Sequence, residues 1–519
     1  MDLALYILFI LLFAALFILR TVYETHMFQL NSYRADTHAK WLKKNKGGFL
    51  IRALPLIVGA ILLPFLKNEI VASVAGSVFF AAGIILNLPE KAKKPLVYTK
   101  RVIRLLITDF VLFAAFTALS CVFCRDTGLR HSLALVFSLF VPAWLLLSNL
   151  INKPIERAIN NYYINDAKKL LASHGSLIKI GVTGSYGKTS VKFMLGTLLE
   201  AKYNVLVTPE SYNTPLGITK TIRSSLNATH DVFVCEMGAK WTGDIKEICD
   251  IVHPDHGIIT SIGPQHLESF GTLDAVKKTK FELADALPPS GKLFLNYNDE
   301  NIRSVNHPHE AVKYGFSPEC DYFADGISVS AKGTSFDVHH GENTVHFTMP
   351  LLGTHNVLNL LGAVSVCSEL GIELEKLPAY AKKLRPVPHR LALSKRGAVT
   401  VIDDAYNSNP SGVRAAMDVL SLFDAFKIVI TPGIVELGSV QEEENYKFGA
   451  LMAGVCDYVV LVGEKQTEPI YRGLIESSYP KEKIYVAKEL SDAIGRAFSY
   501  DTGEKEKIVL FENDLPDNY

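Results

Sequence analysis

Apolar residues gather in five runs within the first 150 residues of the chain. These runs cover about residues 3–19, 51–66, 69–88, 105–124 and 132–150. Each run is close to the roughly 20 residues that a helix needs to cross the hydrocarbon core of a bilayer. Prolines inside or at the edges of the runs leave the number of helices at four or five. We therefore expect residues 1–150 to form a transmembrane anchor.

Basic residues between the runs indicate how this anchor is oriented. Lysine and arginine fill the first and third connections, whereas the second holds Lys67 and the fourth holds Arg125 and Arg130. Because cytoplasmic loops carry the excess of basic residues, the first and third connections are expected inside. Five crossings then leave the N-terminus outside and the residues after 151 in the cytoplasm. The sequence predicts a multi-pass protein of the cell (inner) membrane, without a cleaved signal peptide.

After residue 151, short β-branched runs alternate with helix-length segments. The predicted strands are 178–182, 205–207, 232–235, 257–262, 292–295, 399–403, 427–431, 458–462 and 508–511. This alternation is typical of a parallel sheet with helices on both faces. A polar, β-rich excursion at 300–350 and a proline-marked stretch at 385–388 interrupt it. The predicted fold class is α/β, with a phosphate-loop ATPase domain over 151–384 and a smaller Rossmann-like domain over 385–519.

Composition narrows the choice of partner and compartment. Lys+Arg and Asp+Glu both number 53, so the net charge gives no reason to expect nucleic acid as a partner. The seven cysteines lack the spacing of a disulfide framework, which fits a reducing compartment. Cys121 and Cys124 form a C-x-x-C pair inside an apolar run, and we interpret them as small apolar helix residues rather than as redox groups or metal ligands.

The strand predicted at 178–182 leads into a glycine-rich turn with the chemistry of a phosphate loop. The turn reads Gly184-Ser185-Tyr186-Gly187-Lys188-Thr189-Ser190, and a helix-like run follows it. Backbone N–H groups at such a helix start cradle phosphates, while Lys188 is suited to the β and γ oxygens and Thr189 to Mg²⁺. Val182 stands where the strict motif has glycine, but the order of strand, turn and helix still predicts binding of a nucleoside triphosphate.

Two polar residues that follow buried strands are candidates for the metal site. Glu236 comes directly after the strand at 232–235, at the sheet edge where doubly wound folds bind ligands. A carboxylate there is suited to the metal on a triphosphate, although without the phosphate loop a helix cap would be the favoured reading. His266 follows another strand, and an isolated histidine of this kind is more often structural.

Several segments occur in a fixed order along the chain. They are residues 183–190, 236–239, 260–268, 278–283, 353–359 and 403–410. Together they resemble the motifs of Mur ligases, most of all those of the MurF type, over about residues 176–465. The resemblance implies an ATP-dependent acid–amino-acid ligase that uses ATP and Mg²⁺ and activates a carboxylate as an acyl phosphate.

The same resemblance implies roles for individual residues. At the nucleotide it places Gly184, Ser185, Gly187, Lys188, Thr189, Ser190, Asn356, Arg390, Asp404, Tyr406 and Asn407. At the metal it places Thr189, Glu236, His266 and Lys280, the last as a carbamate. The residues that it implies to be catalytic are Lys188, His266, Lys280 and Arg390.

The chain differs from Mur ligases before the phosphate loop. Only residues 151–177 separate the last apolar run from that loop, which leaves no room for the UDP-binding domain of the family. The expected partners are therefore a small-molecule or lipid-linked wall precursor, an amino acid or dipeptide, and membrane lipid. Two alternatives remain: a polyamide synthase of the poly-γ-glutamate type, and an inactive membrane scaffold with a ligase fold. The presence of Lys188, Glu236 and Asp404 argues against the scaffold.

Overall fold

The computed structural model describes residues 3–88, 94–330, 332–397, 399–405, 409–435 and 437–514, without the side chain of Glu268. The chain divides into two compact units, which we call the helical unit (Met1–Asn161) and the α/β unit (Tyr162–Leu515). The division falls inside one long helix, α7 (Val141–Ala172). Residue 150, the expected end of the anchor, therefore lies within a helix and not in a linker.

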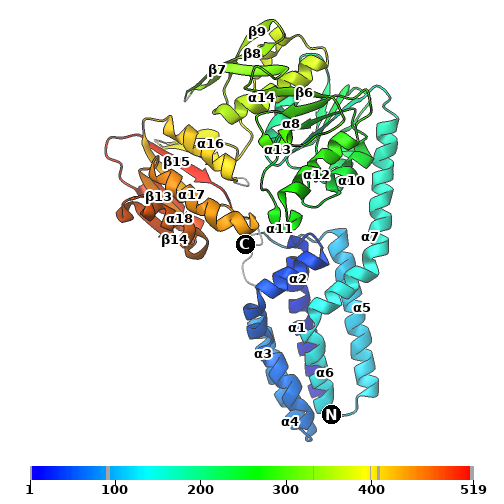
Figure 1. Ribbon diagram of the computed structural model, residues 1–519. Coiled ribbons are helices and arrows are strands. Elements are labelled where there is room, and N and C mark those ends of the chain that lie inside the picture. The colour runs from blue at the N-terminus through cyan, green and yellow to red at the C-terminus, as the bar shows by residue number, and fades with distance from the viewer. Residues whose placement is uncertain are drawn as a thin grey trace. The chain divides into compact units, whose positions relative to one another are not determined.

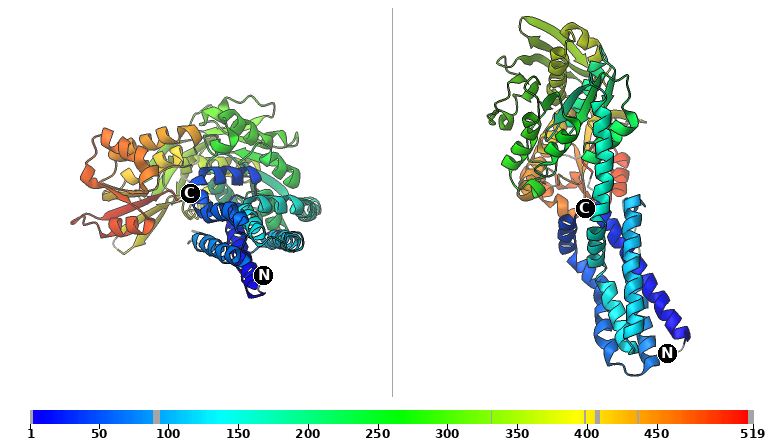
Figure 2. Two further views of the ribbon diagram at one scale, coloured as in Figure 1. Left: turned by 90° about the horizontal axis from the view of Figure 1, so that it is seen from below. Right: turned by 90° about the vertical axis from the view of Figure 1, so that its right-hand side faces the viewer.

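The helical unit is a bundle (Figures 1 and 2). Its other helices are α1 (Leu3–Leu30), α2 (Ala35–Lys44), α3 (Lys46–Leu62), α4 (Glu69–Leu86), α5 (Lys100–Phe123) and α6 (Thr127–Leu139). Among the described residues, four helices are long and apolar enough to cross a membrane, and the pair α6 and α7, bent by 64°, would be a fifth. The bend lies next to Pro142, whose ring and missing N–H favour a helix start. Four or five spans thus remain possible.

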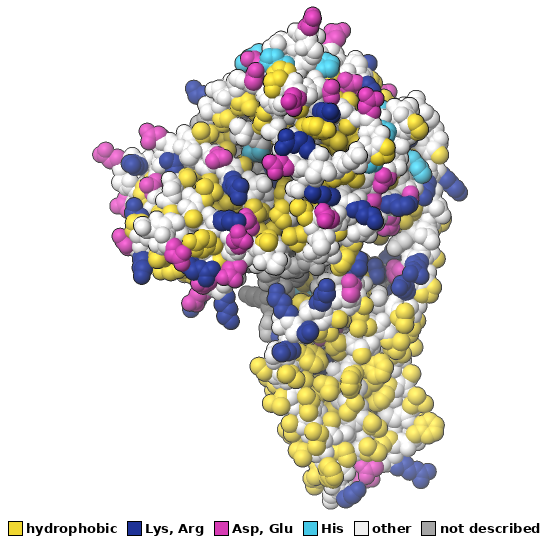
Figure 3. All heavy atoms as spheres, viewed as in Figure 1, with side chains coloured by type: hydrophobic (Ala, Val, Ile, Leu, Met, Phe, Trp, Pro, Cys, Tyr) yellow, Lys and Arg dark blue, Asp and Glu magenta, His cyan; other side chains and the backbone are white. Residues whose placement is uncertain are grey.

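Aromatic rings and small residues hold the bundle together. The ring of Phe113 lies 4.7 Å from that of Phe13 and 4.6 Å from that of Phe17. A Cβ atom on Gly76 would lie 2.4 Å from the His131 ring, so glycine lets α4 and α6 approach closely. In the view of Figure 3, hydrophobic side chains cover much of the middle of the bundle, and charged side chains gather at its two ends. An apolar exterior around a packed interior is the pattern of helices in lipid.

Within the described part of the α/β unit, nine strands form the larger sheet. Their order across the sheet is β2 (Val205–Val207), β3 (Val232–Glu236), β1 (Ile178–Thr183), β4 (His256–Ile259), β5 (Leu293–Asn296), β6 (Ala311–Gly315), β7 (Tyr322–Ser330), β8 (Gly333–His340) and β9 (Asn343–Met349). The first seven in this order run parallel, and β7 to β9 continue the sheet as antiparallel hairpins. The β-rich excursion expected at 300–350 is therefore an extension of the same sheet.

Helices cover both faces of this sheet, as the alternating pattern predicts. On one face α8 (Lys188–Leu199) and α14 (Thr354–Glu369) pack over fully buried residues such as Val182 and Val234. On the other face lie α9 (Pro215–Ser225), α10 (Asp244–Val252), α12 (Leu273–Asp285) and the end of α7. The central parallel strands are thus buried on both sides, and ligands are expected at their carboxyl ends.

The smaller sheet has six strands among the described residues. Their order is β10 (Ala392–Arg396), β11 (Val399–Asp404), β15 (Lys507–Glu512), β12 (Phe426–Thr431), β13 (Tyr458–Val462) and β14 (Ile484–Ala487), and only β10 is antiparallel to its neighbour. Helices α16 (Pro410–Ser421), α17 (Gln441–Ala453) and α18 (Glu464–Glu476) cover one face, and α19 (Leu490–Ser499) covers the other. The predicted α/β fold class with two sheets is confirmed, whereas β10 and β14 had no predicted strand.

Candidate functional site

The phosphate loop lies between β1 and α8, where the sequence places it. Gly184 has φ 153° and Gly187 has φ 80°, which favour glycine. A Cβ atom on Gly184 would lie 2.1 Å from Thr260 Oγ1, and one on Gly187 would lie 2.5 Å from Asn359 Oδ1. The two glycines are therefore required both by the backbone and by close neighbours. Lys188, Thr189 and Ser190 form the first turn of α8.

The segment after β4 fixes the shape of this loop. Ser185 N donates to Ser261 O at 2.7 Å, and Tyr186 N donates to Ser261 Oγ at 2.7 Å. Thr260 Oγ1 donates to Tyr186 O, and Ser185 Oγ donates to Gly263 O at 3.2 Å. These bonds hold the loop backbone in place, so that a phosphate meets a preformed site.

Lys188 is folded back onto its own loop. Its Nζ donates to Gly184 O at 2.7 Å and to Ser185 O at 2.9 Å. Burial lowers the pKa of Lys188 to about 8, although nearby Glu236 works in the opposite direction. The ammonium group of Lys188 now bonds to two neutral carbonyl oxygens. Charged phosphate oxygens bind an ammonium group more strongly than carbonyl oxygens do, so a phosphate could take their place. The residues present thus fit the triphosphate of ATP.

Glu236, at the end of β3, is the centre of a buried polar cluster. Its Oε1 accepts from Thr189 Oγ1 at 3.1 Å and from Asn213 Nδ2 at 3.0 Å, while its Oε2 lies 2.9 Å from Lys192 Nζ. Burial alone would raise the pKa of Glu236, but Lys192 and Lys188 more than offset this and hold it below its usual range. An ionised carboxylate beside a threonine hydroxyl is the oxygen donor set that Mg²⁺ prefers.

Sequence reasoning missed Lys192, which is fully buried. It lies one helical turn after Lys188 inside the run Val191-Lys192-Phe193-Met194-Leu195, and a lysine in such a run is expected to face solvent. The only signal in the sequence is that the residue interrupts an apolar face. Its partner Glu236 comes from a different element, which no local pattern reveals.

Replacing Lys192 by methionine is expected to destabilise the α/β unit by about 3 kcal/mol, because the buried Glu236 carboxylate loses its ion-pair partner. Differential scanning calorimetry of the full chain in detergent measures this loss. Lys246→Met is the matched control, since Lys246 pairs with Asp250 in an exposed position at 2.7 Å. An exposed pair contributes little, so equal shifts for the two variants would contradict the role given to Lys192.

The structure brings only part of the predicted metal set together. Thr189 and Glu236 are in contact, as expected. His266 precedes α11 (Leu267–Phe270) with φ 54°, in the left-handed region. Within the described chain, no group of three or more His, Cys, Asp and Glu side chains is arranged to hold a metal ion. The metal roles of His266 and Lys280 therefore stay predictions.

Lys280 lies in α12 and is only 2% exposed. Burial lowers its pKa well below the ordinary value, and the positive charge of Lys188 nearby lowers it further. A lowered pKa increases the fraction of the neutral amine at a given pH. The neutral amine is the form that reacts with CO₂, so the environment of Lys280 is suited to the expected carbamate.

Two asparagines of α14 differ in their relation to the loop. Asn356, which the resemblance places at the nucleotide, donates through Nδ2 to Leu352 O at 2.8 Å and so fixes the start of its own helix. Asn359 is the residue that faces the loop, since its Oδ1 blocks the Cβ direction of Gly187 at 2.5 Å. The nucleotide role of Asn356 stays a prediction, and sequence reasoning assigned no role to Asn359.

The remaining predicted residues lie on or near β11. Arg390 lies near Asp404, whose Oδ1 accepts from Leu391 N at 3.1 Å. Asp404 lies beside Glu512 of β15 in the strand register and is hydrogen-bonded to it. Burial raises the pKa of Asp404 to about 6, although Arg390 works in the other direction. Tyr406 and Asn407, also expected at the nucleotide, lie outside the described residues.

The raised pKa of Asp404 predicts a pH dependence. The folded state holds a proton that the unfolded chain releases near its ordinary value of 3.8, so this contribution to stability falls as pH rises from about 4 to about 6. A pKa difference of roughly two units between the folded and unfolded states corresponds to at most about 3 kcal/mol of unfolding free energy. Hydrogen exchange of the β11 amides at several pH values measures this contribution. It is the difference in unfolding free energy between the wild type and Asp404→Asn, whose amide side chain cannot titrate. The same pH profile for both proteins would contradict the assignment.

Comparison with known proteins identifies the family. The family model for the Mur ligase middle domain matches residues 182–367. The model for the Mur ligase glutamate ligase domain matches residues 389–511. The UDP-N-acetylmuramoyl-tripeptide–D-alanyl-D-alanine ligase of Haemophilus influenzae is 30% identical over 347 residues, which cover 65% of this chain and 71% of that protein. The chain belongs to the Mur ligase family.

Further relatives agree with this assignment. The ligase of the same name from Bacillus subtilis is 30% identical over 290 residues, 55% of this chain and 62% of the relative. The chain thus spans less than two thirds of that relative's length. A crystal structure of MurF from Acinetobacter baumannii superimposes with a TM-score of 0.62 at 25% identity, covering 69% of this chain and 78% of that one. The expected resemblance, and ATP and Mg²⁺ as the cofactors of the family, are confirmed.

Proposed function

We propose that this protein is a membrane-anchored, ATP-dependent ligase that forms an amide bond on a cell-wall precursor. The observation that carries the proposal is the buried cluster of Lys188, Thr189 and Glu236 at the phosphate loop. Similarity to ligases of the MurF type supports the reaction class. The cluster supports ATP as the activating substrate.

The reaction would proceed in two steps. An oxygen of the acceptor carboxylate attacks the γ-phosphorus of ATP, and ADP leaves. The incoming amine then attacks the acyl carbon, phosphate leaves with the carboxylate oxygen, and the amine loses a proton. Lys188 would neutralise charge on the transferred phosphoryl group, and Thr189 and Glu236 would hold Mg²⁺, which would supply further positive charge there.

The helical unit supports the membrane assignment. Its candidate spans have mean hydropathies between 2.0 and 2.7, and each exposes large apolar side chains to its surroundings. Water does not favour such an exterior, whereas lipid does. The middle-domain match begins only at residue 182, so the helical unit lies where the relatives have other sequence.

The acceptor that we propose takes account of the helical unit, which precedes the matched residues. The relatives are named for a UDP-linked muramoyl tripeptide and for D-alanyl-D-alanine. A membrane unit suits a related precursor that is linked to lipid, and a dipeptide such as D-alanyl-D-alanine is the first amine to test.

Release of ADP and phosphate by the full chain in detergent tests the proposal. Release should require both a wall-precursor carboxylate and an amine, and the product should gain one amino acid or dipeptide. Repeated addition of a single amino acid would indicate a polyamide synthase instead. Absence of ATP turnover with every wall-pathway carboxylate and amine would overturn the proposed function.

A further inference from the structure

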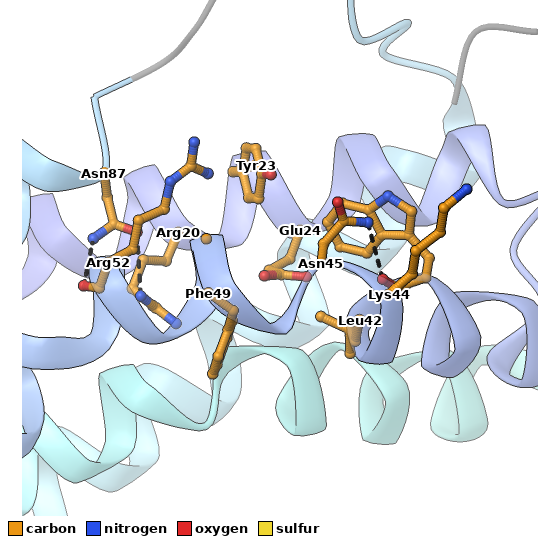
Figure 4. A pocket seen from close by; sticks show the side chains of 12 residues that line it. Arg20, Tyr23, Glu24, Leu42, Lys44, Asn45, Phe49, Arg52 and Asn87 are labelled. Carbon is orange, nitrogen blue, oxygen red and sulfur yellow. Dashed lines mark hydrogen bonds between the residues drawn. The ribbon is translucent and has the colours of Figure 1, made fainter. Parts of the chain in front are cut away.

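The helical unit contains a cavity of about 420 Å³ at one end of the bundle. Its walls come from the second half of α1, from the chain between Trp41 and Arg52, and from Asn87 after α4. Figure 4 shows Arg20, Arg52 and Asn87 grouped at one side of the cavity and Glu24, Asn45 and Lys44 at the other. At the same end of the bundle α5 begins, and Arg104 Nε of α5 lies 2.6 Å from Glu156 Oε1 of α7.

Two guanidinium groups in this cavity lie beside neutral side chains. Arg20 is 3% exposed, and its Nη1 donates to the amide oxygen of Asn87 at 3.1 Å. Its Nε has no hydrogen-bond partner among the described residues. The Arg20 guanidinium also lies 5.5 Å from the ring centre of Phe49, and that of Arg52 lies 4.6 Å from the ring centre of Tyr23. A buried guanidinium with an unused donor is an incomplete arrangement that an anion would complete.

The charge of the lining favours an anion. Three basic side chains, Arg20, Lys44 and Arg52, face one carboxylate, Glu24. Glu24 offsets part of this positive charge, because it lies near Arg20 and its Oε2 lies 3.4 Å from His38 Nε2. Guanidinium groups present paired N–H donors that match phosphate oxygens, and this makes a phosphate the best-fitting anion.

The size and position of the cavity point to a lipid. A volume of about 420 Å³ falls in the range of pockets for small organic ligands and leaves room beside a phosphate. Aromatic side chains, among them Trp41 and Phe49, provide apolar contacts in the same cavity. The cavity also lies at the ends of candidate spans, at the level where lipid headgroups meet basic residues.

We propose that this cavity binds the phosphate or diphosphate headgroup of a membrane lipid. In the proposed function, on which this last step rests, that lipid is the carrier of the acceptor. The helical unit then replaces the missing nucleotide-sugar recognition, because it holds the phosphate end of the precursor. Free phosphate or diphosphate shares the same chemistry without the lipid, and the experiment separates these two sources.

The cavity supplies its own reporter and its own blocking site. Trp41 lines it, and replacing Trp144 and Trp241 by phenylalanine leaves Trp41 as the only tryptophan of the three. Gly48 also lines it, and a Cβ atom there meets no atom within 4 Å. Gly48→Leu therefore adds a large side chain at the cavity wall without a clash at its Cβ, and leucine is a better helix former than glycine in α3. Gly48→Ala is the matched small substitution.

The experiment titrates a long-chain polyprenyl diphosphate into the full chain in phosphatidylcholine nanodiscs and follows Trp41 fluorescence. Saturable binding is expected, weakened at least about tenfold by Gly48→Leu, Arg20→Gln and Arg52→Gln. Gly48→Ala should bind like the parent. Arg130→Gln should too, because Arg130 bonds to Cys124 O beyond the other end of α5. Polyprenyl alcohol, which lacks phosphate, should not bind.

The comparison arms decide the source of the anion. Inorganic diphosphate that bound as tightly as the lipid would overturn the lipid assignment, as would binding that Gly48→Leu leaves unchanged. Equal binding of polyprenyl alcohol would overturn the phosphate assignment. Phosphatidylglycerol that bound as tightly as the polyprenyl diphosphate would support a lipid phosphate site but overturn the carrier role. Lys188→Met should bind normally, so failure of the ligase proposal and failure of this one are distinguishable.

Discussion

Lys188→Met is expected to lower kcat/KM for ATP-dependent ligation by about 10³-fold or more. The Nζ of Lys188 is the buried cation nearest the loop carbonyls that surround the phosphate position, and methionine keeps its length without its charge. Loss of a single preformed charge-stabilising group in such a site commonly costs two to three orders of magnitude. The rate of ADP release under saturating acceptor and amine measures the effect.

A control separates catalysis from folding. Burial disfavours the charged form of Lys188, but its charge stabilises the buried Glu236 carboxylate, so calorimetry must first show that Lys188→Met is folded at the assay temperature. Lys202→Met makes the same change at an exposed lysine after α8 and should leave the rate unchanged. A Lys188→Met enzyme that kept more than about a tenth of its activity would be inconsistent with the role given to the loop.

Lys280→Ala is expected to lower kcat by about 10²-fold or more, because it removes the anionic carbamate proposed to serve the metal. In the wild type the neutral amine of Lys280 attacks CO₂ and loses a proton, which gives a carbamate. Activity of protein depleted of CO₂ should therefore rise when bicarbonate is added, and Lys280→Ala should show no such rise. Lys278→Ala, at an exposed position of the same helix, should behave like the wild type.

Magnetic resonance with isotopically labelled bicarbonate tests the modification itself. A carbamate signal should appear in the wild type and in Lys278→Ala, and it should be missing in Lys280→Ala. Wild-type protein that is fully active without CO₂ and shows no signal would remove Lys280 from the metal site.

The parts of the site that were predictable from sequence are those formed by residues and elements that follow one another directly along the chain. Strand, glycine turn and helix follow one another over Ile178–Leu199, so the loop could be located without a structure. Glu236 could be located because a polar residue at the end of a buried parallel strand must lie at the ligand edge. The apolar runs likewise predicted α1, α3, α4 and α5, since each is long and continuous.

The parts that were not predictable depend on contacts between distant segments. Asn359 reaches Gly187 only because α14 packs beside α8, more than 150 residues later in the chain. From the sequence, Lys192 is expected to be a solvent-facing helix residue. In the structure it pairs with Glu236 at the end of β3, a contact that no local pattern predicts. Short strands such as β14 carry too few residues for a clear pattern. The cavity around Arg20 was also missed, because its lining comes from three separate segments of the chain.

The central claim is that ATP activates a carboxylate of the acceptor. If it does, one oxygen of that carboxylate leaves with the phosphate when the amide bond forms. The most direct measurement uses an acceptor whose carboxylate carries a heavy-oxygen label and determines the mass of the released phosphate. Our account predicts that each phosphate formed with product contains one labelled oxygen. Phosphate that contains no label while product accumulates would contradict it.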